Sequence, residues 1–321
     1  MDDQLVLPGK PGLHVCMSTS ELIHDGQPFL WKDHQTTGFS TSQFRAAIAN
    51  GDVEQVMDRV YADARADDTR DFRIQAAKLV VPAHAVICDE TAAWLWGVDT
   101  HRPSDRHSFV PKWVVPHGQS RTRLDGMFCR QAKLPNDDIA DLGGLAVTNP
   151  VRTTGDLLRK QWRPYAMASA DAMAHADLVR PMDVRGHLAQ LKGFPGIRQA
   201  RMLSRHIESK SASRGESWTR LRLIDAGFPT PKAQVEVMDA EGGVRFLDLA
   251  YERRKIAIEY DGREFHTADA DGLHDLDRRE LIVATGYRFV VARYEQIFGT
   301  DDAFEREVGE LIGMSPIARW W

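Results

Sequence analysis

The sequence predicts a mixed α/β (α+β) fold whose carboxyl-terminal part is an αβββαβ unit. Three observations lead to this prediction: helical and strand-like apolar patterns alternate, Gly and Pro turns separate them, and the composition is that of a globular protein. Apolar residues make up 43% and charged residues 27% of the 321 residues, which excludes a wholly disordered chain. At roughly 150 residues per domain, this length indicates about two domains.

The first predicted helix covers residues 41–50. Ser40 and Gln43 have the spacing of a capping box, apolar residues at 44, 47 and 48 form one stripe, and Asn50-Gly51 ends the pattern. The following segment, Val53–Tyr61, is rich in strand-forming residues.

This helix, turn and strand are compatible with the recognition helix and wing of a winged helix over about residues 15–62. An ordinary small helix beside a hairpin is the alternative, because the acidic residues at 52, 54 and 58 would face DNA phosphates unfavourably. In the winged-helix interpretation, the candidate DNA contacts are Gln43, Arg45 and Arg59.

The middle of the chain is also predicted to be mixed α/β. We expect a buried helix over Ala85–Gly97, a strand over Ser108–Pro116, and a strand from Leu145 that runs into a stop at Pro150. A later segment rich in Lys, Arg and Ser, Ser204–Ser217, is the best candidate for a linker. It predicts a boundary near residue 210, which divides the chain into regions 1–209 and 210–321.

The carboxyl-terminal region shows the clearest order of elements. Turn signals separate them, among them Gly227 with two nearby prolines, the Gly242-Gly243 pair, and Gly286 after the second helix. The predicted elements are a helix Glu216–Ala226, strands Gln234–Met238, Val244–Tyr251 and Lys255–Asp261, a helix Asp271–Thr285, and a strand Tyr287–Arg293.

Acidic residues interrupt two of these strands, where apolar residues are usual. Asp248 lies within a strand-forming run, and a buried carboxylate is costly unless it is paired or binds a metal. In the next strand, a period of two places Glu259 and Asp261 on one face. If a hairpin pairs these strands in a suitable register, the carboxylates converge as a hard divalent cation requires.

This pattern resembles the PD-(D/E)xK restriction-endonuclease-like superfamily, and more closely its very-short-patch-repair-like endonuclease domains. The resemblance covers about residues 213–298. The matching pieces are Asp248, Glu259-Tyr-Asp-Gly262, His266, Asp275-Leu-Asp-Arg278 and Gly286-Tyr287. It implies a site that binds Mg²⁺ or Mn²⁺ and hydrolyses phosphodiester bonds.

The resemblance also implies roles for individual residues. Asp248, Glu259 and Glu216 would hold the metal, His266 would carry a proton, and Arg278 would bind a phosphate or pair with Asp275. Together with Asp261, these three carboxylates and His266 form the expected catalytic set.

One residue departs from the superfamily pattern. Asp261 stands where a Lys is usual, so Lys255 or Arg263 would have to supply the positive charge. A purely structural alternative also stays open, in which Asp248 pairs with an arginine at 245 or 254 and Asp261-Gly262 is an ordinary turn.

The upstream region resembles an actinobacterial arrangement in which an abortive-infection-type, antitoxin-like regulator with an amino-terminal winged helix precedes such a nuclease-like domain. This resemblance covers most of residues 15–160. The matching pieces are Thr41–Tyr61, Asp89–Ala93 with Trp96-Gly97, and Val147–Thr153. It implies DNA as one partner and a toxin, or a repair or defence protein, as another.

Charge and cysteine content narrow the remaining classes. With 41 Lys and Arg against 46 Asp and Glu, the formal net charge is −5, so a strongly basic nucleic-acid coat or a polybasic membrane-surface protein is not expected, although a local basic groove is compatible with it. Cys16, Cys88 and Cys129 are isolated and predict no disulfide framework. Because no apolar run approaches ~18 residues, we expect a cytoplasmic protein without membrane contact.

Three functions follow from these inferences. The first is a metal-dependent DNA endonuclease that its amino-terminal region targets to DNA. The alternative is a non-catalytic DNA-binding transcriptional regulator or antitoxin that retains a nuclease-like scaffold. An RNA nuclease would use the same carboxylates. Dependence on Mg²⁺ separates the first two, because only the nuclease needs the carboxylates for its activity.

Overall fold

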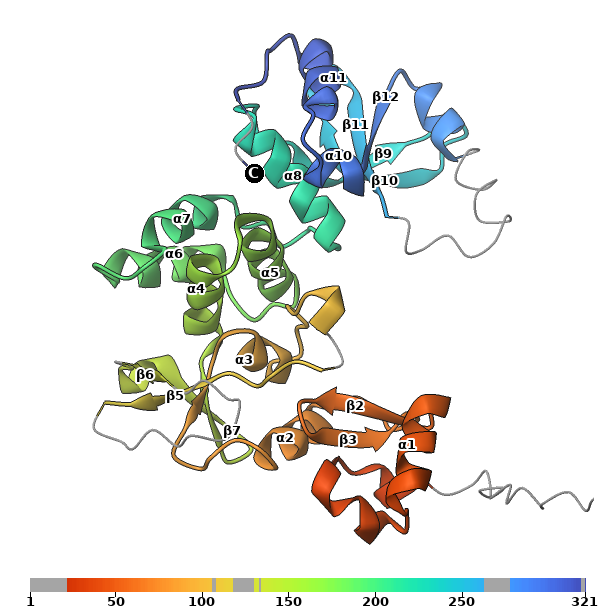
Figure 1. The fold of residues 1–321 in the computed structure, drawn as a ribbon. Coiled ribbons are helices and arrows are strands. Elements are labelled where there is room, and N and C mark those ends of the chain that lie inside the picture. The colour runs from red at the N-terminus through yellow and green to blue at the C-terminus, as the bar shows by residue number, and fades with distance from the viewer. Residues whose placement is uncertain (1–21, 106–107, 118–129, 133, 263–277, 319–320) are drawn as a thin grey trace, which may run out of the picture.

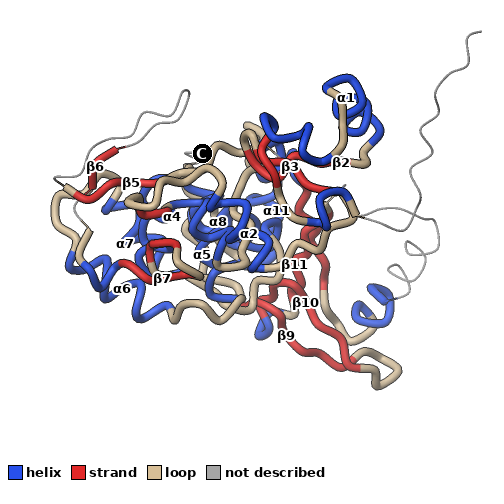
Figure 2. The backbone as a smooth tube through the Cα atoms, turned by 90° about the horizontal axis from the view of Figure 1, so that it is seen from below, coloured by secondary structure: helices blue, strands red, loops and turns tan. Residues whose placement is uncertain are grey.

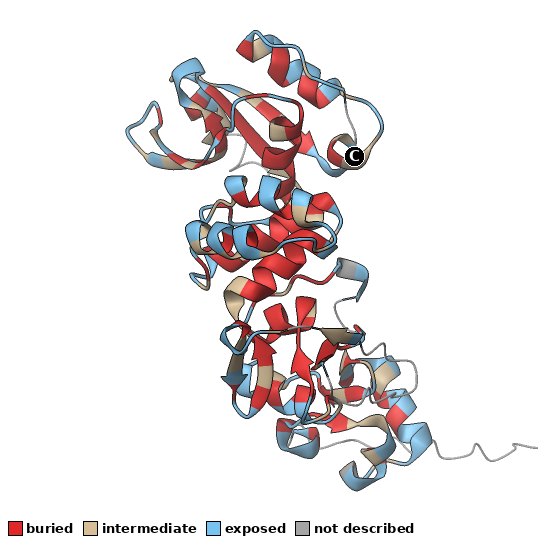
Figure 3. Ribbon diagram, turned by 90° about the vertical axis from the view of Figure 1, so that its left-hand side faces the viewer, coloured by how far each residue is buried: buried red, intermediate tan, exposed pale blue. Residues whose placement is uncertain are grey.

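The computed structural model describes residues 22–105, 108–117, 130–132, 134–262, 278–318 and 321, which form a mixed α+β fold, as the sequence predicts. Three sheets follow one another along the chain, and a layer of helices, residues 150–203, lies between the second and the third (Figure 1). Buried residues gather in the interior of each layer (Figure 3).

The amino-terminal unit combines one α-helix with a small antiparallel sheet. The Ser40 side chain accepts a hydrogen bond from the Gln43 backbone N–H, and the Gln43 side chain accepts one from the Ser40 backbone N–H at 2.9 Å, so the predicted capping box is confirmed. The elements are 3₁₀ helices Ile23–Gly26 and Trp31–Thr37, helix α1 (Thr41–Asn50), and strands β1 (Phe29–Leu30), β2 (Val53–Met57) and β3 (Val60–Asp63), in the order β1-β3-β2.

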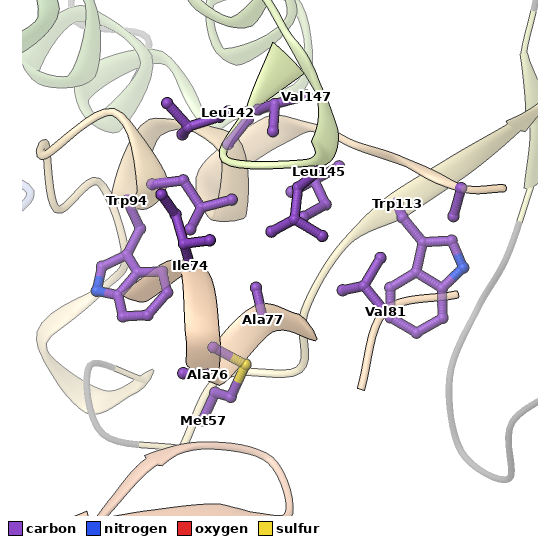
Figure 4. Close-up of a cluster of buried hydrophobic side chains, with 14 of the residues drawn as sticks. Met57, Ile74, Ala76, Ala77, Val81, Trp94, Trp113, Leu142, Leu145 and Val147 are labelled. Carbon is purple, nitrogen blue, oxygen red and sulfur yellow. The ribbon is translucent and has the colours of Figure 1, made fainter. Parts of the chain in front are cut away.

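The single strand predicted over Val53–Tyr61 is wrong, because this segment forms the β2–β3 hairpin. Asp58 and Arg59 make the turn, and Arg59 has a φ of 67°. The Asp58 N–H donates to the carbonyl of Phe109 at 2.9 Å, and Met57 packs into the core of the middle sheet (Figure 4). The hairpin tip is therefore anchored on the next part of the chain.

The middle region contains a five-stranded sheet in the order β6-β5-β4-β8-β7. The β4–β8 and β5–β6 pairs are parallel, and the other two pairs are antiparallel. Its elements are helices α2 (Arg70–Lys78) and α3 (Asp89–Leu95) and strands β4 (Val86–Ile87), β5 (Trp113–Pro116), β6 (Arg130–Ala132), β7 (Ile139–Leu142) and β8 (Leu145–Thr148).

Two predicted bounds in this region differ from the structure, and one predicted stop has a second role. The helix expected over Ala85–Gly97 begins at Asp89, because a two-residue strand precedes it within the same apolar run, where periodicity cannot separate the two. The strand expected over Ser108–Pro116 begins at Trp113. Pro150 opens a helix as well as following a strand, since its fixed φ and missing N–H suit the first helical position.

Four helices follow the middle sheet and pack around their own apolar core. They are α4 (Pro150–Lys160), α5 (Arg163–His175), α6 (Pro181–Gln190) and α7 (Ile197–Leu203). Leu221, which belongs to the next helix along the chain, completes that core.

The carboxyl-terminal region has the predicted order of elements, and a four-stranded sheet is its centre. The helix expected over Asp271–Thr285 is described from residue 278 and is helical to residue 283. The other elements of this region are α8 (Arg214–Asp225), β9 (Lys232–Met238), β10 (Val244–Tyr251), β11 (Ile256–Asp261), β12 (Arg288–Arg293), α10 (Tyr294–Phe298) and α11 (Ala303–Ile312), and the sheet order is β12-β11-β10-β9. The last two helices were not predicted.

The segment predicted as a linker lies between two regions that pack against each other. Ser211 is buried, and α8 begins within the segment. Buried ion pairs join α5 to α8, with Arg220 2.6 Å from Asp171, and Arg163 paired with Asp225. The division near residue 210 stays a prediction, and these contacts join the two regions through a shared interior.

Candidate functional site

Three carboxylates from α8, β10 and β11 interact at the four-stranded sheet. Strands β10 and β11 are antiparallel with Leu249 opposite Ile258, and this register continued by one residue places Asp248 opposite Glu259. Opposed residues direct their side chains to the same face of a sheet, so the predicted approach of these two carboxylates follows from the strand register. The Tyr260 N–H donates to Asp248 Oδ2 at 3.4 Å.

The surroundings of Asp248 change its pKa. Burial, followed by the negative charges of Glu216 and Glu259, raises its pKa to about 6. Ionisation of Asp248 therefore costs more free energy than that of an ordinary aspartate, because the carboxylate has lost solvent and faces two like charges. A proton or a cation would relieve this repulsion.

Glu216 reaches the cluster from the first turn of α8. The Ser213 side chain caps this helix by accepting from the Glu216 N–H. Glu216 Oε2 accepts from the Ala212 N–H at 3.1 Å and from Gln234 Nε2 at 3.0 Å. Gln234 was not predicted as a site residue, and a glutamine in a strand carries no signal of this contact.

Gly215 brings α8 close to β11. A Cβ atom built at this position would lie 2.0 Å from Cδ1 of Tyr260, so any larger residue must displace the ring or the helix. The absence of a side chain at residue 215 thus sets the position of its neighbour Glu216 relative to the sheet.

Both carboxylate oxygens of Glu259 are held by arginines. Glu259 is 3% exposed, Arg278 Nη2 lies 2.7 Å from Oε1, and Arg279 Nε lies 2.9 Å from Oε2. Arg278, predicted to bind phosphate or pair with Asp275, is paired with Glu259. Arg279 was missed, because the Arg278-Arg279 dipeptide in the sequence also fits a solvated helix face.

Two other predicted residues of this site, Asp261 and Lys255, contact residues outside the three carboxylates. Asp261 Oδ2 lies 3.7 Å from Arg293 Nε. Lys255 directly precedes β11, and its Nζ donates to the carbonyl of Thr285 at 2.5 Å. His266 and Arg263 lie outside the described residues. Over the described part of the chain, no three His, Cys, Asp or Glu side chains are arranged to hold a metal ion, and the metal site stays a prediction.

Helix α1, which carries Gln43 and Arg45, lies at the outer edge of the molecule (Figure 2). Phe44 anchors α1 and is fully buried, whereas Arg45, the next residue of the helix, is exposed. The oxygen of the Gln43 side chain is engaged in the capping box. Arg59 lies at the hairpin turn, 3.4 Å from the carboxylate of Asp58.

Comparison with known proteins identifies the middle of the chain. Residues 85–205 match the family model of the AbiEi antitoxin C-terminal domain, so this part is an AbiEi-like region, as the sequence resemblance implies. The matched region covers the five-stranded sheet and helices α4 to α7, and it ends before the carboxylates of the third sheet.

Two uncharacterized proteins from two strains of Mycobacterium tuberculosis are similar over most of the chain. Each is 28% identical over 251 residues, which covers 77% of this chain and 88% of the relative. Among the residues that the structure describes, no helix is long and apolar enough to cross a membrane.

Proposed function

We propose that the protein is a DNA-binding transcriptional regulator of the antitoxin class, and that α1 makes the main DNA contact. The observation that carries this proposal is the match of residues 85–205 to an antitoxin domain, which follows the amino-terminal helix and hairpin after one further helix, α2. A toxin protein is the second partner that this class implies.

The surface of α1 supports the proposed contact. Its buried face is narrow, and Arg45, Ala46 and Ala49 are among its exposed residues. Small side chains let a helix approach closely, and the major groove of B-DNA is about 12 Å wide, enough for an α-helix. Arg45 would then bind a phosphate or a base edge. The anchored hairpin tip makes Arg59 a secondary contact in this proposal.

Binding in EDTA tests the regulator against the nuclease. The full chain would be mixed with duplex DNA from the region upstream of its own coding sequence, with EDTA or with Mg²⁺, and followed by gel shift. A regulator forms the same complex in both buffers and leaves the DNA intact. Cleavage that needs Mg²⁺ and is lost in Asp248→Asn would contradict a purely regulatory role.

A metal-dependent endonuclease is the second candidate, and the raised pKa of Asp248 favours it. The carboxylate oxygens of Asp248 and Glu216 suit Mg²⁺ or Mn²⁺ as ligands. Glu259 would become a third ligand once Arg278 and Arg279 no longer pair with it. Such an ion activates water for hydrolysis of a phosphodiester in DNA or RNA. Arg278 and Arg279, released from Glu259, would bind the phosphate of the substrate.

Thermal unfolding with added metal tests this second candidate. Because a ligand of the native state stabilises by mass action, Mg²⁺ or Mn²⁺ should raise the Tm of the wild-type chain. Asp248→Asn should lose this rise, whereas Glu236→Gln, which changes an exposed carboxylate on β9 of the same sheet, should keep it. Equal rises in all three proteins would rule out a metal site at Asp248.

A further inference from the structure

A cavity of about 550 Å³ opens in the AbiEi-like region, beside α4 and the ends of the central strands of the five-stranded sheet. It is distinct from both sites described above. Four basic side chains line it: Arg130 of β6 and Arg152, Arg159 and Lys160 of α4. The positions 152, 156, 159 and 160 share one helix face, because they are spaced by three, four, seven and eight residues.

Three carboxylates contact these cations without balancing them. Asp89, Asp138 and Asp156 supply three negative charges against four positive ones, so the cavity keeps an excess of one positive charge. The contacts are Asp156 with Arg152 (3.1 Å), Arg159 (2.5 Å) and Lys160 (3.2 Å), Asp89 with Arg130 (3.2 Å) and Lys160, and Asp138 with Arg152 (2.6 Å).

His187 does not add to this charge at neutral pH. Its ring lies 3.7 Å from Asp138, and burial lowers its pKa. Asp156 remains ionised in spite of its burial, because Lys160, Arg152 and Arg159 bring its pKa down to about 2. The charges around the cavity therefore do not change near neutral pH, and the cavity keeps its excess positive charge.

Arg159 lines the cavity and is held by several hydrogen bonds. The side chain is 5% exposed, its Nη2 contacts Asp156, and its Nη1 donates to the carbonyl of Pro195 at 2.8 Å. Its Nε is buried and has no acceptor among the described residues. A buried N–H without an acceptor costs free energy, and a ligand in the cavity would reach this atom only if the Arg159 side chain moved.

We propose that this cavity binds a phosphate group, either as inorganic phosphate or as the phosphate of a mononucleotide. Guanidinium groups present donors that match phosphate oxygens, and Arg130, whose side chain is 45% exposed, has N–H groups left to donate. Phe194, whose ring centre lies 5.0 Å from the Arg159 guanidinium carbon, and Leu134 supply an apolar wall against which a base fits. The volume lies in the range of small-molecule sites.

Calorimetric titration of the full chain with inorganic phosphate, AMP and adenosine tests the proposal. We expect saturable binding of AMP or phosphate and none of adenosine. Arg130→Gln should weaken it about tenfold or more, the worth of one hydrogen bond to a charged group. The Arg130 side chain is 45% exposed, so this change should leave the fold intact. Lys160→Gln is a second variant with the same expected direction.

Arg180→Gln is the matched control, because Arg180 pairs with one carboxylate, Asp183, and its side chain is 75% exposed on another helix. It should bind as the wild type does. AMP binding more tightly than phosphate would identify the nucleotide as the source, and equal binding would identify the phosphate group alone. Absence of binding by both, equal binding of adenosine, or wild-type affinity in both pocket variants would overturn the proposal.

Discussion

The ionisation of a single residue, Asp248, affects the stability of the fold. Its pKa rises from the ordinary 3.8 to about 6 in the folded protein, chiefly through burial and then through Glu216 and Glu259. A carboxyl with a raised pKa binds more protons folded than unfolded, so the protein loses stability as the pH rises from about 4 to about 6. The ionised Asp248 then remains a destabilising group at neutral pH.

Asp248→Asn should therefore stabilise the metal-free protein at about pH 7.5, by at most about 3 kcal/mol. Near pH 4 the variant and the wild type should differ much less, since the wild-type side chain is protonated there. Urea unfolding at both pH values measures the difference. Glu236→Gln, an exposed carboxylate, is the control and should change little. A variant less stable than the wild type at pH 7.5 would show that the carboxylate is compensated.

The sequence predicts the acidic residues of this cluster better than their partners. Asp248 and Glu259 stand out because carboxylates are unusual in apolar strands, and alternation along a strand assigns them a face. The clamp of Arg278 and Arg279 on Glu259 depends on how a helix lies over a strand about twenty residues away. A local sequence pattern does not show which helix packs over which strand. The two arginines therefore could not be assigned as partners of Glu259.

At the scale of elements, the contact of α8 with β11 depends on Gly215. Gly215→Ala should destabilise the protein by about 1–3 kcal/mol, because the added methyl group overlaps the ring of Tyr260. Gly186→Ala in α6 is a matched control, since a Cβ there meets no atom within 4 Å and alanine favours a helix. Chemical denaturation measures both. If Gly215→Ala is as stable as the control, the close approach has no structural role.

The carboxyl-terminal elements could be predicted because Gly or Pro separates most of them. Strand β10 has the predicted bounds, and Gly286, with a φ of 94°, lies in the turn between the second helix and β12. In the middle sheet the strands have two to four residues, too few for an alternating pattern. Helix α10 was missed because it starts at Tyr294, directly after β12, without a turn residue between them.

At the scale of the whole molecule, the parts share interiors that no local pattern predicts. Met57 of the hairpin lies in the core of the middle sheet, and Leu221 of α8 lies in the core of the preceding helices. Such contacts arise between segments distant in sequence. The polar stretch near residue 210 therefore suggests a linker in the sequence. In the structure it leads directly into the buried helix α8.

The central claim is that the protein is a DNA-binding regulator whose α1 contacts DNA. Fluorescence anisotropy of labelled duplex DNA, titrated with the full chain at several salt concentrations in EDTA, tests it most directly. Binding to phosphates releases counterions, so affinity should fall as salt rises, and Arg45→Ala should weaken binding and reduce the slope of log affinity against log salt by about 1. Arg180→Ala and Asp248→Asn should bind as the wild type does. Absence of salt-dependent binding by the wild type, or identical affinity and slope for Arg45→Ala, would contradict the claim.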